Sequence, residues 1–386
     1  MSLDSETAVA RAVLIHGPIS RSALTTRLDL SPASLTRLTR PLLDRGLLIE
    51  LDEVADGSIG RRSRPLAVAP DAGRFLGIKL TGDRLYAVHT DVRATVLDAR
   101  EVAIGDTSPA AVCDLISAVA ADLSSTAPHA HVGPDPALSG VGICLGGSVR
   151  HGVIENASFL GWTDVDLVTL LNDRLDAPVT VENDLIALAE AERWFGVGRD
   201  LPGFVVVTIG AGVGYALVIN GQTIRTPDAG VGTGGHIPLS ATGPVCADGH
   251  RGCARALLTS GSIAGQVSAA LGRTVTFDDV LTLADEGAPA AGTVIDDAAR
   301  ALGVLLSLAT NLTLQSSVVL AGEGVELYER TRERVHATLA DHRDPLSQTV
   351  TVHVDDSGFT AWARGAAAVA IQHELAHLPA RRVARA

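Results

Sequence analysis

A glycine-rich stretch at residues 231–253, VGTGGHIPLSATGPVCADGHRGC, contains the side chains best suited to binding a metal ion. The soft ligands in it are His236, Cys246 and Cys253. Zn²⁺ takes imidazole and thiolate readily, and a structural zinc site has four ligands in a tetrahedron. Asp248 and His250 are the two candidates for the fourth position, since either completes a mixed site that suits zinc. We therefore predict a structural zinc site, the alternative being a packed loop without metal.

The composition describes a globular chain with unevenly distributed charge. Its 386 residues and 46% hydrophobic content are enough for two or three domains with sizeable cores. The formal net charge of −13 argues against a chain that coats nucleic acid or an anionic membrane along its whole length. Residues 1–70, however, contain nine arginines against eight acidic residues, whereas the remainder contains 22 basic and 36 acidic residues. The first seventy residues are therefore a separate electrostatic unit.

The sequence has few of the features that are typical of an exported protein or of a membrane protein. The chain has four cysteines, and Cys113 and Cys144 lie in apolar sequence, so a disulfide framework is not expected. The first residues are acidic where a signal peptide requires a basic region. The most hydrophobic stretch, residues 204–219, is interrupted by glycines and is shorter than the roughly 20 residues that a spanning helix needs. We expect a cytoplasmic protein without a membrane segment.

The pattern of residues 1–70 predicts a winged helix-turn-helix. Apolar residues recur at helical spacing over residues 6–15, and residues 21–28 predict a second short helix after a turn. Ser31 is a good N-cap for a third helix that begins at Pro32. Two short strands are expected to follow, at residues 47–51 and 65–68. This order of elements is that of a DNA-binding domain whose third helix enters the major groove.

The third helix and the turn between the two strands supply the DNA-binding candidates. The inward stripe of the helix is expected at Leu35, Leu38 and Leu42. The residues then left facing DNA are Ser34, Arg37 and Arg40. The turn DGSIGRRSRP adds Arg61, Arg62 and Arg64 at the position of the wing, where arginines can follow a narrow minor groove. A solvated turn is the alternative. Pro41 deletes the bond to the carbonyl of Arg37 and is expected to kink or shorten the helix.

The rest of the chain alternates strand-like and helical runs from Phe75 onward, which predicts an α/β arrangement. Over about residues 8–375 the sequence resembles the ROK family of repressors, open reading frames and sugar kinases. The zinc stretch resembles that family's motif, G-H followed by C-x-C-G-x-x-G-C, with Asp248 in place of the middle cysteine. The front domain resembles the xylose-repressor branch. The resemblance implies an actin/hexokinase-like (RNase H-like) fold of two α/β lobes with the ligand between them.

These resemblances divide the chain into a winged helix-turn-helix at residues 1–70 and a ROK domain at residues 71–386. Lobe 1 is expected at about residues 71–190 together with a C-terminal helix at residues 364–378, and lobe 2 at about residues 191–363.

The resemblance also implies which residues contact a sugar. Residues 142–149 resemble a G-I-x-x-P-G-x-V turn that contains Gly147, and NASFLGW resembles an N-x-P-x-x-x-W loop that begins at Asn156. The stretch VENDLIALAE resembles an E-N-D-A-N-A motif, which places Asn183 and Asp184 among the sugar-binding residues. An amide and a carboxylate together donate and accept, as neighbouring hydroxyls do. An N-cap at the start of a helix is the alternative role for this motif.

Departures from the kinases argue against phosphoryl transfer. The first phosphate loop, D-x-G-G-T, corresponds to residues 79–83, so that Lys79 replaces a metal-organising aspartate and Asp83 replaces a phosphate-binding threonine. A carboxylate about 4 Å from a phosphate charge costs on the order of 4 kcal/mol at an effective dielectric of about 20. The second loop, GAGVGY at residues 210–215, lacks the family's threonine. Neither catalytic residues nor ATP as a cofactor are therefore expected.

Two further departures change the sugar site. Thr233 and Arg255 each stand where the family has a sugar-binding glutamate, while His236 keeps its place. Arg255 and Lys79 would suit an anionic ligand such as a sugar phosphate or a sugar acid. A structural salt bridge is the simpler role for Arg255.

The sequence thus predicts a DNA-binding transcriptional regulator, most simply a repressor, that senses a sugar or sugar derivative without phosphorylating it. Its expected partners are a double-stranded operator, the small-molecule effector and further copies of the chain in a homodimer or homotetramer. The alternatives are an active ATP-dependent sugar kinase and a DNA-binding protein whose cleft senses nothing.

Overall fold

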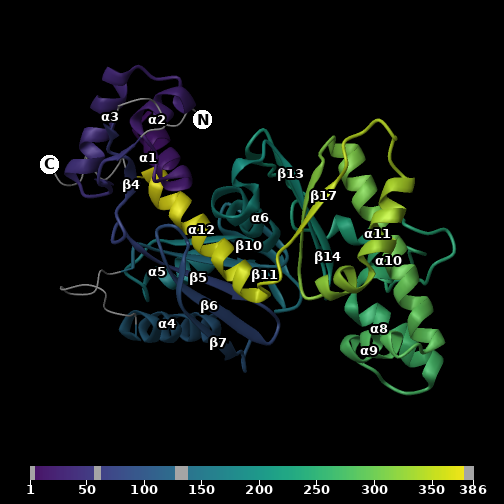
Figure 1. The fold of residues 1–386 in the computed structure, drawn as a ribbon. Coiled ribbons are helices and arrows are strands. Elements are labelled where there is room, and N and C mark those ends of the chain that lie inside the picture. Colours follow the sequence, from purple (N-terminus) through teal and green to yellow (C-terminus); the bar gives the residue numbers. More distant parts are fainter. Residues whose placement is uncertain (1–4, 56–61, 127–137, 378–386) are drawn as a thin grey trace. The chain divides into compact units, whose positions relative to one another are not determined.

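The computed structural model describes residues 5–55, 62–126 and 138–377 (Figure 1). The chain forms two compact units. The first consists of residues 1–199 together with residues 362–386, and the second of residues 200–361.

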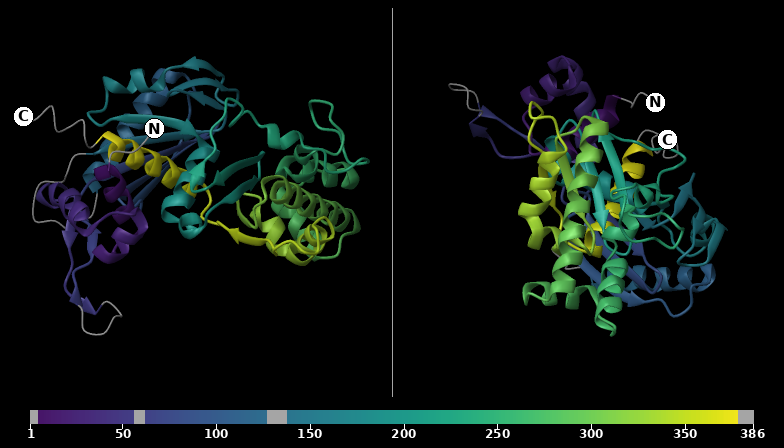
Figure 2. Two further views of the ribbon diagram at one scale, coloured as in Figure 1. Left: turned by 90° about the horizontal axis from the view of Figure 1, so that it is seen from above. Right: turned by 90° about the vertical axis from the view of Figure 1, so that its right-hand side faces the viewer.

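The first unit begins with helices and short strands that form a winged helix-turn-helix. Its elements are α1 (Ser5–His16), α2 (Arg21–Leu28), α3 (Pro32–Asp44), β1 (Leu48–Glu50), β2 (Val54–Ala55), β3 (Arg62–Ser63) and β4 (Leu66–Val68). Strand β1 pairs antiparallel with β4, and β2 pairs antiparallel with β3 at the position of the wing. The β2–β3 pair extends away from the helices (Figure 2).

Helix α3 forms as the sequence predicts at its start and differs near its end. The hydroxyl of Ser31 accepts a hydrogen bond from the backbone N–H of Ser34 at 3.1 Å, which confirms the predicted N-cap. Leu35 and Leu42 are buried in the small core of this domain. Of the two effects expected from Pro41, the shortening does not occur, because α3 continues to Asp44. A proline so close to the C-terminus removes one internal bond and leaves the last turn in place.

A mixed sheet forms the centre of the first lobe, in the strand order β12-β8-β5-β6-β7. Strand β5 pairs antiparallel with β6 and parallel with β8, and β8 pairs parallel with β12. A smaller sheet has the order β11-β10-β9. The strands are β5 (Arg74–Leu80), β6 (Arg84–Asp91), β7 (Val96–Ala103), β8 (Gly140–Leu145), β9 (Ser148–Arg150), β10 (Val153–Ala157), β11 (Trp162–Val165) and β12 (Val179–Asn183). The helices of this lobe are α4 (Pro109–Thr126), α5 (Leu167–Asn172), α6 (Asp184–Phe195) and α12 (Phe359–His377), with the 3-10 turn η1 (Val197–Asp200) after α6.

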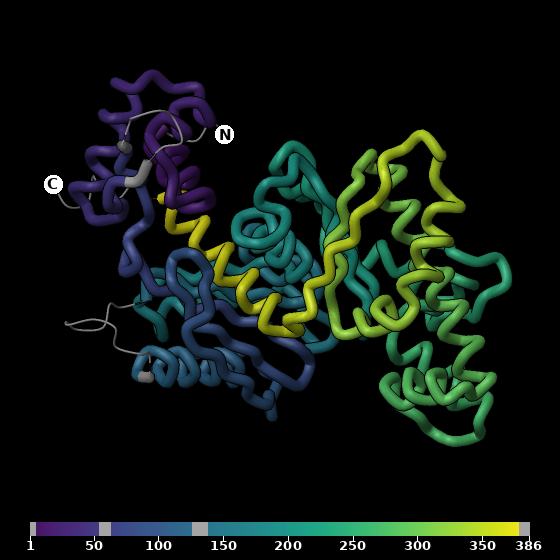
Figure 3. The backbone as a smooth tube through the Cα atoms, in the orientation of Figure 1, coloured from purple at the N-terminus to yellow at the C-terminus, as the bar shows by residue number. Residues whose placement is uncertain are grey.

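Helix α12 packs directly on the backbone of this sheet. A Cβ at Gly77 would lie 2.0 Å from the carbonyl oxygen of Ala363, and one at Gly142 would lie 1.8 Å from that of Ala366. The alanine-rich sequence of α12 and the glycines of β5 and β8 therefore fit one another. The C-terminal end of α12 returns to α1 (Figure 3). There Leu375 packs with the core of the helix-turn-helix.

The second unit is built on a sheet in the order β15-β14-β13-β16-β17, with β13, β16 and β17 parallel and β14 antiparallel to β13. Its strands are β13 (Phe204–Ile209), β14 (Val213–Ile219), β15 (Gln222–Thr223), β16 (Ser317–Ala321) and β17 (Thr351–Val354). Its helices are η2 (Thr233–His236), α7 (Ala254–Leu258), α8 (Ser260–Leu271), α9 (Phe277–Asp285), α10 (Pro289–Thr313) and α11 (Val325–Asp341).

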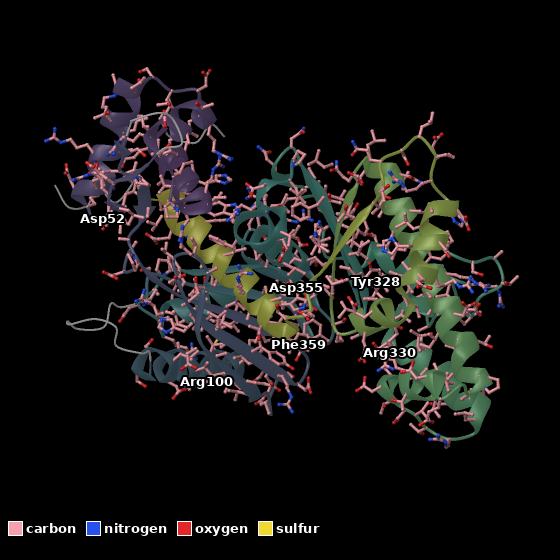
Figure 4. The ribbon with its side chains drawn as sticks, viewed as in Figure 1. Asp52, Arg100, Tyr328, Arg330, Asp355 and Phe359 are labelled. Carbon is pink, nitrogen blue, oxygen red and sulfur yellow. The ribbon has the colours of Figure 1, made fainter. Side chains whose placement is uncertain are left out.

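The helices of the second unit share one apolar core with the sheet. Residues of α10 such as Leu302 and Leu306 are fully buried against β13 and β16 residues such as Val205 and Val318. At the surface, Arg330 on α11 donates to Glu326 one turn earlier and to Asp285 at the end of α9 (Figure 4). The core and this ion pair fix the helices on the sheet that carries the glycine-rich segments.

The predicted fold class is confirmed: a winged helix-turn-helix precedes two α/β lobes with the strand arrangement of the actin/hexokinase fold. Among the residues that the structure describes, none of the helices combines the length and the apolar composition required to cross a membrane.

Candidate functional site

The candidate metal ligands of the second unit lie in a loop that two isolated bridges hold together. Pro238 pairs with Cys253, and Val245 pairs with Arg251. Between the second pair of residues, the N–H of Cys246 donates to the carbonyl of His250 at 2.9 Å. This tight turn brings the side chains of Cys246 and His250 close together.

Glycine is required where the loop closes. Gly252 has a φ of +61°, and a Cβ there would lie 1.9 Å from the carbonyl oxygen of Ser240. Gly249 has a φ of +85°. Both conformations favour glycine, which explains the G-x-x-G spacing next to the cysteines.

The structure gathers the donor atoms of His236, Cys246 and His250 within 4.8 Å of one another. The Nδ1 atoms of the two histidines are 3.0 Å apart, and Cys246 Sγ is 3.7 Å from His250 Nδ1. Donors on one tetrahedral zinc ion lie about 3.3 Å apart for two nitrogens and about 3.5 Å apart for nitrogen and sulfur, given bonds of about 2.0 and 2.3 Å. The spacing and the chemistry of this donor set therefore fit a zinc ion.

The two cysteines of the loop lie next to each other. Cys253 is 1% exposed at the N-cap of α7, and its thiol interacts with that of Cys246. Desolvation opposes ionisation of Cys246, but hydrogen bonds from the backbone of Asp248 and His250 and from the side chains of Cys253 and His250 together lower the pKa of the thiol. Burial raises the pKa of the Cys253 thiol. A cation between these sulfurs would favour both thiolates.

Asp248 faces the cluster from its outer side. Its Oδ2 is 3.1 Å from Nη1 of Arg255 and 3.8 Å from Nε2 of His236. The Nδ1 of His236 meanwhile points to His250. Arg255 is thus in the salt bridge that the sequence suggested as its simpler role. Thr233 is exposed at the start of η2, three residues before His236.

In the first unit, Asn183 ends β12 and caps α6. Its Oδ1 accepts from the N–H groups of Leu185 at 3.0 Å and Ile186 at 3.3 Å. Its Nδ2 donates to the carbonyl of Gly147 at 2.9 Å and to Asp184 Oδ1 at 3.3 Å. Asn183 is therefore the N-cap that the sequence offered as the alternative role for this motif. Its amide oxygen bonds to the start of α6, and its amide nitrogen bonds to Gly147 and Asp184.

Asp184 is paired with Lys79 across the sheet. Lys79 is 6% exposed on β5, and its Nζ donates to Oδ2 of Asp184. The same Nζ lies 5.1 Å from the centre of the Trp362 ring, at the start of α12. An ammonium ion thus neutralises the carboxylate of Asp184. The sequence indicated Lys79 and Asp184 as candidate site residues. It did not indicate their contact, because 105 residues separate them.

The other predicted residues of this site are Gly147, in the turn between β8 and β9, and Asn156, on β10. Gly147 has a φ of +121°, and a Cβ there would lie 2.2 Å from the carbonyl oxygen of Asn156, so only glycine fits. The side chain of Asn156 is exposed. Phe159, which sequence analysis did not single out, is 42% exposed. Its ring atom Cε1 and Asp184 Oδ2 would both lie 3.5 Å from a Cβ at Gly146, so an exposed aromatic ring lies close to the carboxylate.

The glycine-rich loop after β13 is closed by a carboxylate of the chain itself. The N–H of Ala211 donates to Oε1 of Glu323 at 2.8 Å. A Cβ at Gly210 would lie 2.5 Å from the other carboxylate oxygen of Glu323. Backbone N–H groups of such loops are the groups that cradle phosphates, and here a carboxylate occupies one of them. The role of Glu323 was not predicted from the sequence.

The candidate DNA contacts lie on α3 and beside the wing. Arg37 and Arg40 are exposed, and Arg40 Nε is 3.9 Å from Asp44 Oδ2. Ser34 is half-buried, with its hydroxyl accepting from Ser31 at 3.0 Å, so it faces outward less than the sequence indicates. Arg64 is exposed, with Nε 3.7 Å from Glu53 Oε1. Arg61 lies outside the described residues, as does the side chain of Arg62.

Comparison with known proteins places the chain in a family. The model of the ROK family matches residues 75–373. The xylose repressor of Bacillus spizizenii is 23% identical over 367 residues, which are 95% of this chain and 94% of that protein. A solved ROK family transcriptional regulator, described as a homolog of the Escherichia coli MLC protein, superimposes with a TM-score of 0.80 at 23% identity and covers 96% of both chains.

A kinase structure matches a smaller part of the chain. The ROK hexokinase of Thermus thermophilus gives a TM-score of 0.65 at 24% identity and covers 78% of this chain but 98% of its own. The additional length in this chain is shared with the regulators. On the match of the family model over most of its length, this chain belongs to the ROK family.

Proposed function

We propose that this protein is a DNA-binding transcriptional regulator of the repressor type whose kinase-like domain senses a small ligand. The observation that carries the proposal is the match to repressors over nearly the whole chain, helix-turn-helix included. The exposed Arg37 and Arg40 on α3 support contact with the major groove. In this proposal residues 1–70 bind DNA and residues 71–386 bind the effector.

The chemistry of the two loops supports a sensor rather than an enzyme. Kinases need an aspartate that can accept the proton of a hydroxyl and loops that accept phosphates. Here Lys79 holds Asp184 in a buried ion pair, so a carboxylate oxygen that would accept the proton already accepts a hydrogen bond from an ammonium ion. Glu323 places negative charge in the glycine-rich loop, where it would repel a phosphate. Neither kinase activity nor ATP binding is part of the proposal.

The effector proposed is a neutral sugar or a neutral sugar derivative. Asp184, Asn156 and Gly147 supply polar groups, and Phe159 supplies an exposed aromatic face of the kind that packs on the C–H groups of a sugar ring. Asn183 has its hydrogen bonds within the protein, so its part is to position Gly147 and Asp184.

The charges near the proposed ligand residues argue against an anionic effector. Lys79 is neutralised by Asp184, and Arg255 by Asp248. From the second unit, Thr233, His236 and Arg255 remain proposed ligand contacts through the family resemblance.

The proposed metal site contains zinc bound by His236, Cys246, His250 and Cys253. Asp248 is then a partner of Arg255 that faces the outer nitrogen of His236, a place where carboxylates orient metal-bound imidazoles. When bound, zinc supplies a rigid cross-link between the loop and α7 and no catalysis.

The proposed partner is a double-stranded operator bound by a homodimer or by a homotetramer. Two recognition helices must lie about 34 Å apart, one turn of DNA, to read two half-sites. A ligand changes DNA affinity only by binding one arrangement of the chain more tightly than another, typically by about 1–3 kcal/mol.

Selection of operators from randomised duplex DNA with the full-length protein tests the proposal. An enriched motif with two half-sites is the expected result, and Arg37→Ala should weaken binding to it at least about tenfold, or about 1.4 kcal/mol. Arg84→Ala is the matched control, since Arg84 is exposed on β6 in an ion pair with Glu101. No enriched motif, or equal effects of the two substitutions, would contradict the proposal.

Two further measurements address the sensing domain. A coupled assay with ATP and a panel of sugars should show no turnover, and measurable turnover would identify a kinase. D-xylose and N-acetylglucosamine are the first probes, because relatives are named as repressors for these sugars. Binding should raise the melting temperature and change operator affinity. A panel of sugars without effect on either would favour a cleft that senses nothing.

A further inference from the structure

Helix α6 joins the proposed ligand site to the DNA-binding domain within the first unit. It begins at Asp184, whose carboxylate is paired with Lys79. It ends at Phe195, and its last turns carry Glu190, Arg193 and Trp194. These residues pack beside α1, the first helix of the winged helix-turn-helix. One continuous helix therefore has its first residue at one site and its last turn at the other.

The contact between α6 and α1 has an apolar part. Leu14 of α1 and Trp194 of α6 are buried in one cluster with Ala370 and Ile371 of α12. Leu14 is 3% exposed and Trp194 is 4% exposed. A second link to α1 does not use α6, because Arg93 donates to the carbonyl of Gly17 directly after that helix.

A buried carboxylate lies at the centre of the polar part. Glu190 is 1% exposed, and its Oε2 accepts from Arg193 Nε at 2.9 Å and from Gln372 Nε2 on α12 at 2.9 Å. The charge of Glu190 also acts on Arg11 of α1. Burial lowers the pKa of Arg11, the charge of Arg193 lowers it further, and the charge of Glu190 raises it. One carboxylate thus interacts with residues of α1, α6 and α12.

The two helices that reach this carboxylate also share the ligand end. Trp362, at the start of α12, lies over the ammonium group of Lys79. Between the two ends the helices touch through their backbones, since a Cβ at Gly365 would lie 2.7 Å from the carbonyl of Ala187. Close backbone contact leaves little room for one helix to move without the other. A displacement at Asp184 would therefore reach Glu190 along both helices.

We propose that Glu190 is the positioning residue through which a change at Asp184 is transmitted to α1 and so to the recognition helix. The proposal rests on the function proposed above and adds the path of its regulation. A buried charge suits this role because its hydrogen bonds are directional: a small shift of α6 or α12 lengthens some of them and favours another arrangement of the partner side chains.

Amide hydrogen exchange on the full-length protein tests the path without requiring a ligand or an operator. Asp184→Asn removes the partner of Lys79 at one end, and exchange is followed over residues 5–16 at the other. The expected result is exchange in α1 faster by about fivefold or more, the lower end of typical coupling factors. In a Glu190→Gln background the same substitution should change exchange in α1 less than about twofold, because the path is interrupted.

Two variants keep the test decisive. Gln372→Met cuts the bond from α12 to Glu190 and leaves Arg193 paired, so it replaces Glu190→Gln if that variant does not fold. Arg93→Gln is the matched control, since it loosens α1 through Gly17 and leaves α6 intact. Its effect on exchange should add to that of Asp184→Asn.

The proposal is overturned if Asp184→Asn leaves exchange in α1 unchanged. It is equally overturned if the effects of Asp184→Asn and of the Glu190 or Gln372 variant simply add. Sequence-selective DNA binding by the same samples would then show that the proposed function stands without this path. Loss of selective binding by the unaltered protein would contradict the proposed function itself, whatever the exchange data show.

Discussion

Replacing Asp184 with asparagine should strongly destabilise the first unit, although the change removes only a charge. The side chains of Lys79 and Asp184 are 7% and 13% exposed, so the substitution leaves an ammonium ion in the interior without its carboxylate. Removing one member of a buried ion pair costs about 3–5 kcal/mol, most of it the desolvation of the remaining charge. At 2–4 °C per kcal/mol, about 3 kcal/mol lowers the melting temperature by roughly 6–12 °C.

Removal of both charges should cost much less than removal of either one. A Lys79→Met/Asp184→Asn protein keeps the volume of the side chains and buries no unpaired ion, so it should recover most of the loss. Calorimetry of the single and double variants measures the coupling. The matched control is Arg84→Ala, which breaks an exposed pair with Glu101 and should cost at most about 1 kcal/mol.

The physical reasoning about the buried pair is refuted by either of two results. In one, the Asp184→Asn variant has the same melting temperature as the unaltered protein, which would mean that water solvates the ammonium ion of Lys79 when the carboxylate is absent. In the other, the double variant is as unstable as the sum of the two single variants, which would mean that the two charges do not interact.

Three other predictions concern the second unit and the packing of α12. His250→Ala should lower the zinc content of the purified protein, measured by plasma mass spectrometry, while Asp248→Ala should retain it; zinc loss in the second variant alone would assign Asp248 as the ligand. Glu323→Ala should let millimolar inorganic phosphate raise the melting temperature, which it should not do for the unaltered protein; equal shifts would show that Glu323 does not close the loop. Gly142→Ala should cost at least about 3 kcal/mol in urea denaturation because its Cβ would meet the backbone of α12, whereas Gly265→Ala, in open space on α8, should stabilise by about 0.5–1 kcal/mol.

Local features of the sequence predicted the secondary structure well, and the failure at α3 has a local cause. The spacing of apolar residues and the cap at Ser31 depend on neighbours within one or two turns, so they can be read without knowledge of the fold. The prediction that Pro41 shortens the helix failed because proline breaks the interior of a helix, whereas α3 has only three residues beyond Pro41.

Contacts between residues that are distant in the sequence determine the candidate sites. The sequence predicted only some of these contacts. The motif around Cys246 indicated zinc, but it could not choose between Asp248 and His250, because that choice depends on how the turn after Cys246 closes. The charge reversal at Lys79 was visible, while its pairing with Asp184 follows from the register of β5, β8 and β12. Glu323 was overlooked because its partner, Ala211, lies 112 residues earlier.

The ion pair between Lys79 and Asp184 also bears on how a sensor could arise from a kinase-like fold. In a kinase the aspartate must be free to accept a proton at the moment of reaction. Here it joins β5 to the first residue of α6, so a ligand hydroxyl that bonds to the carboxylate competes with a contact inside the protein. The binding energy then differs between two arrangements of α6, and such a difference is what shifts a conformational equilibrium. In the function proposed above, such competition requires no new binding residue, only the ammonium group of Lys79 beside Asp184.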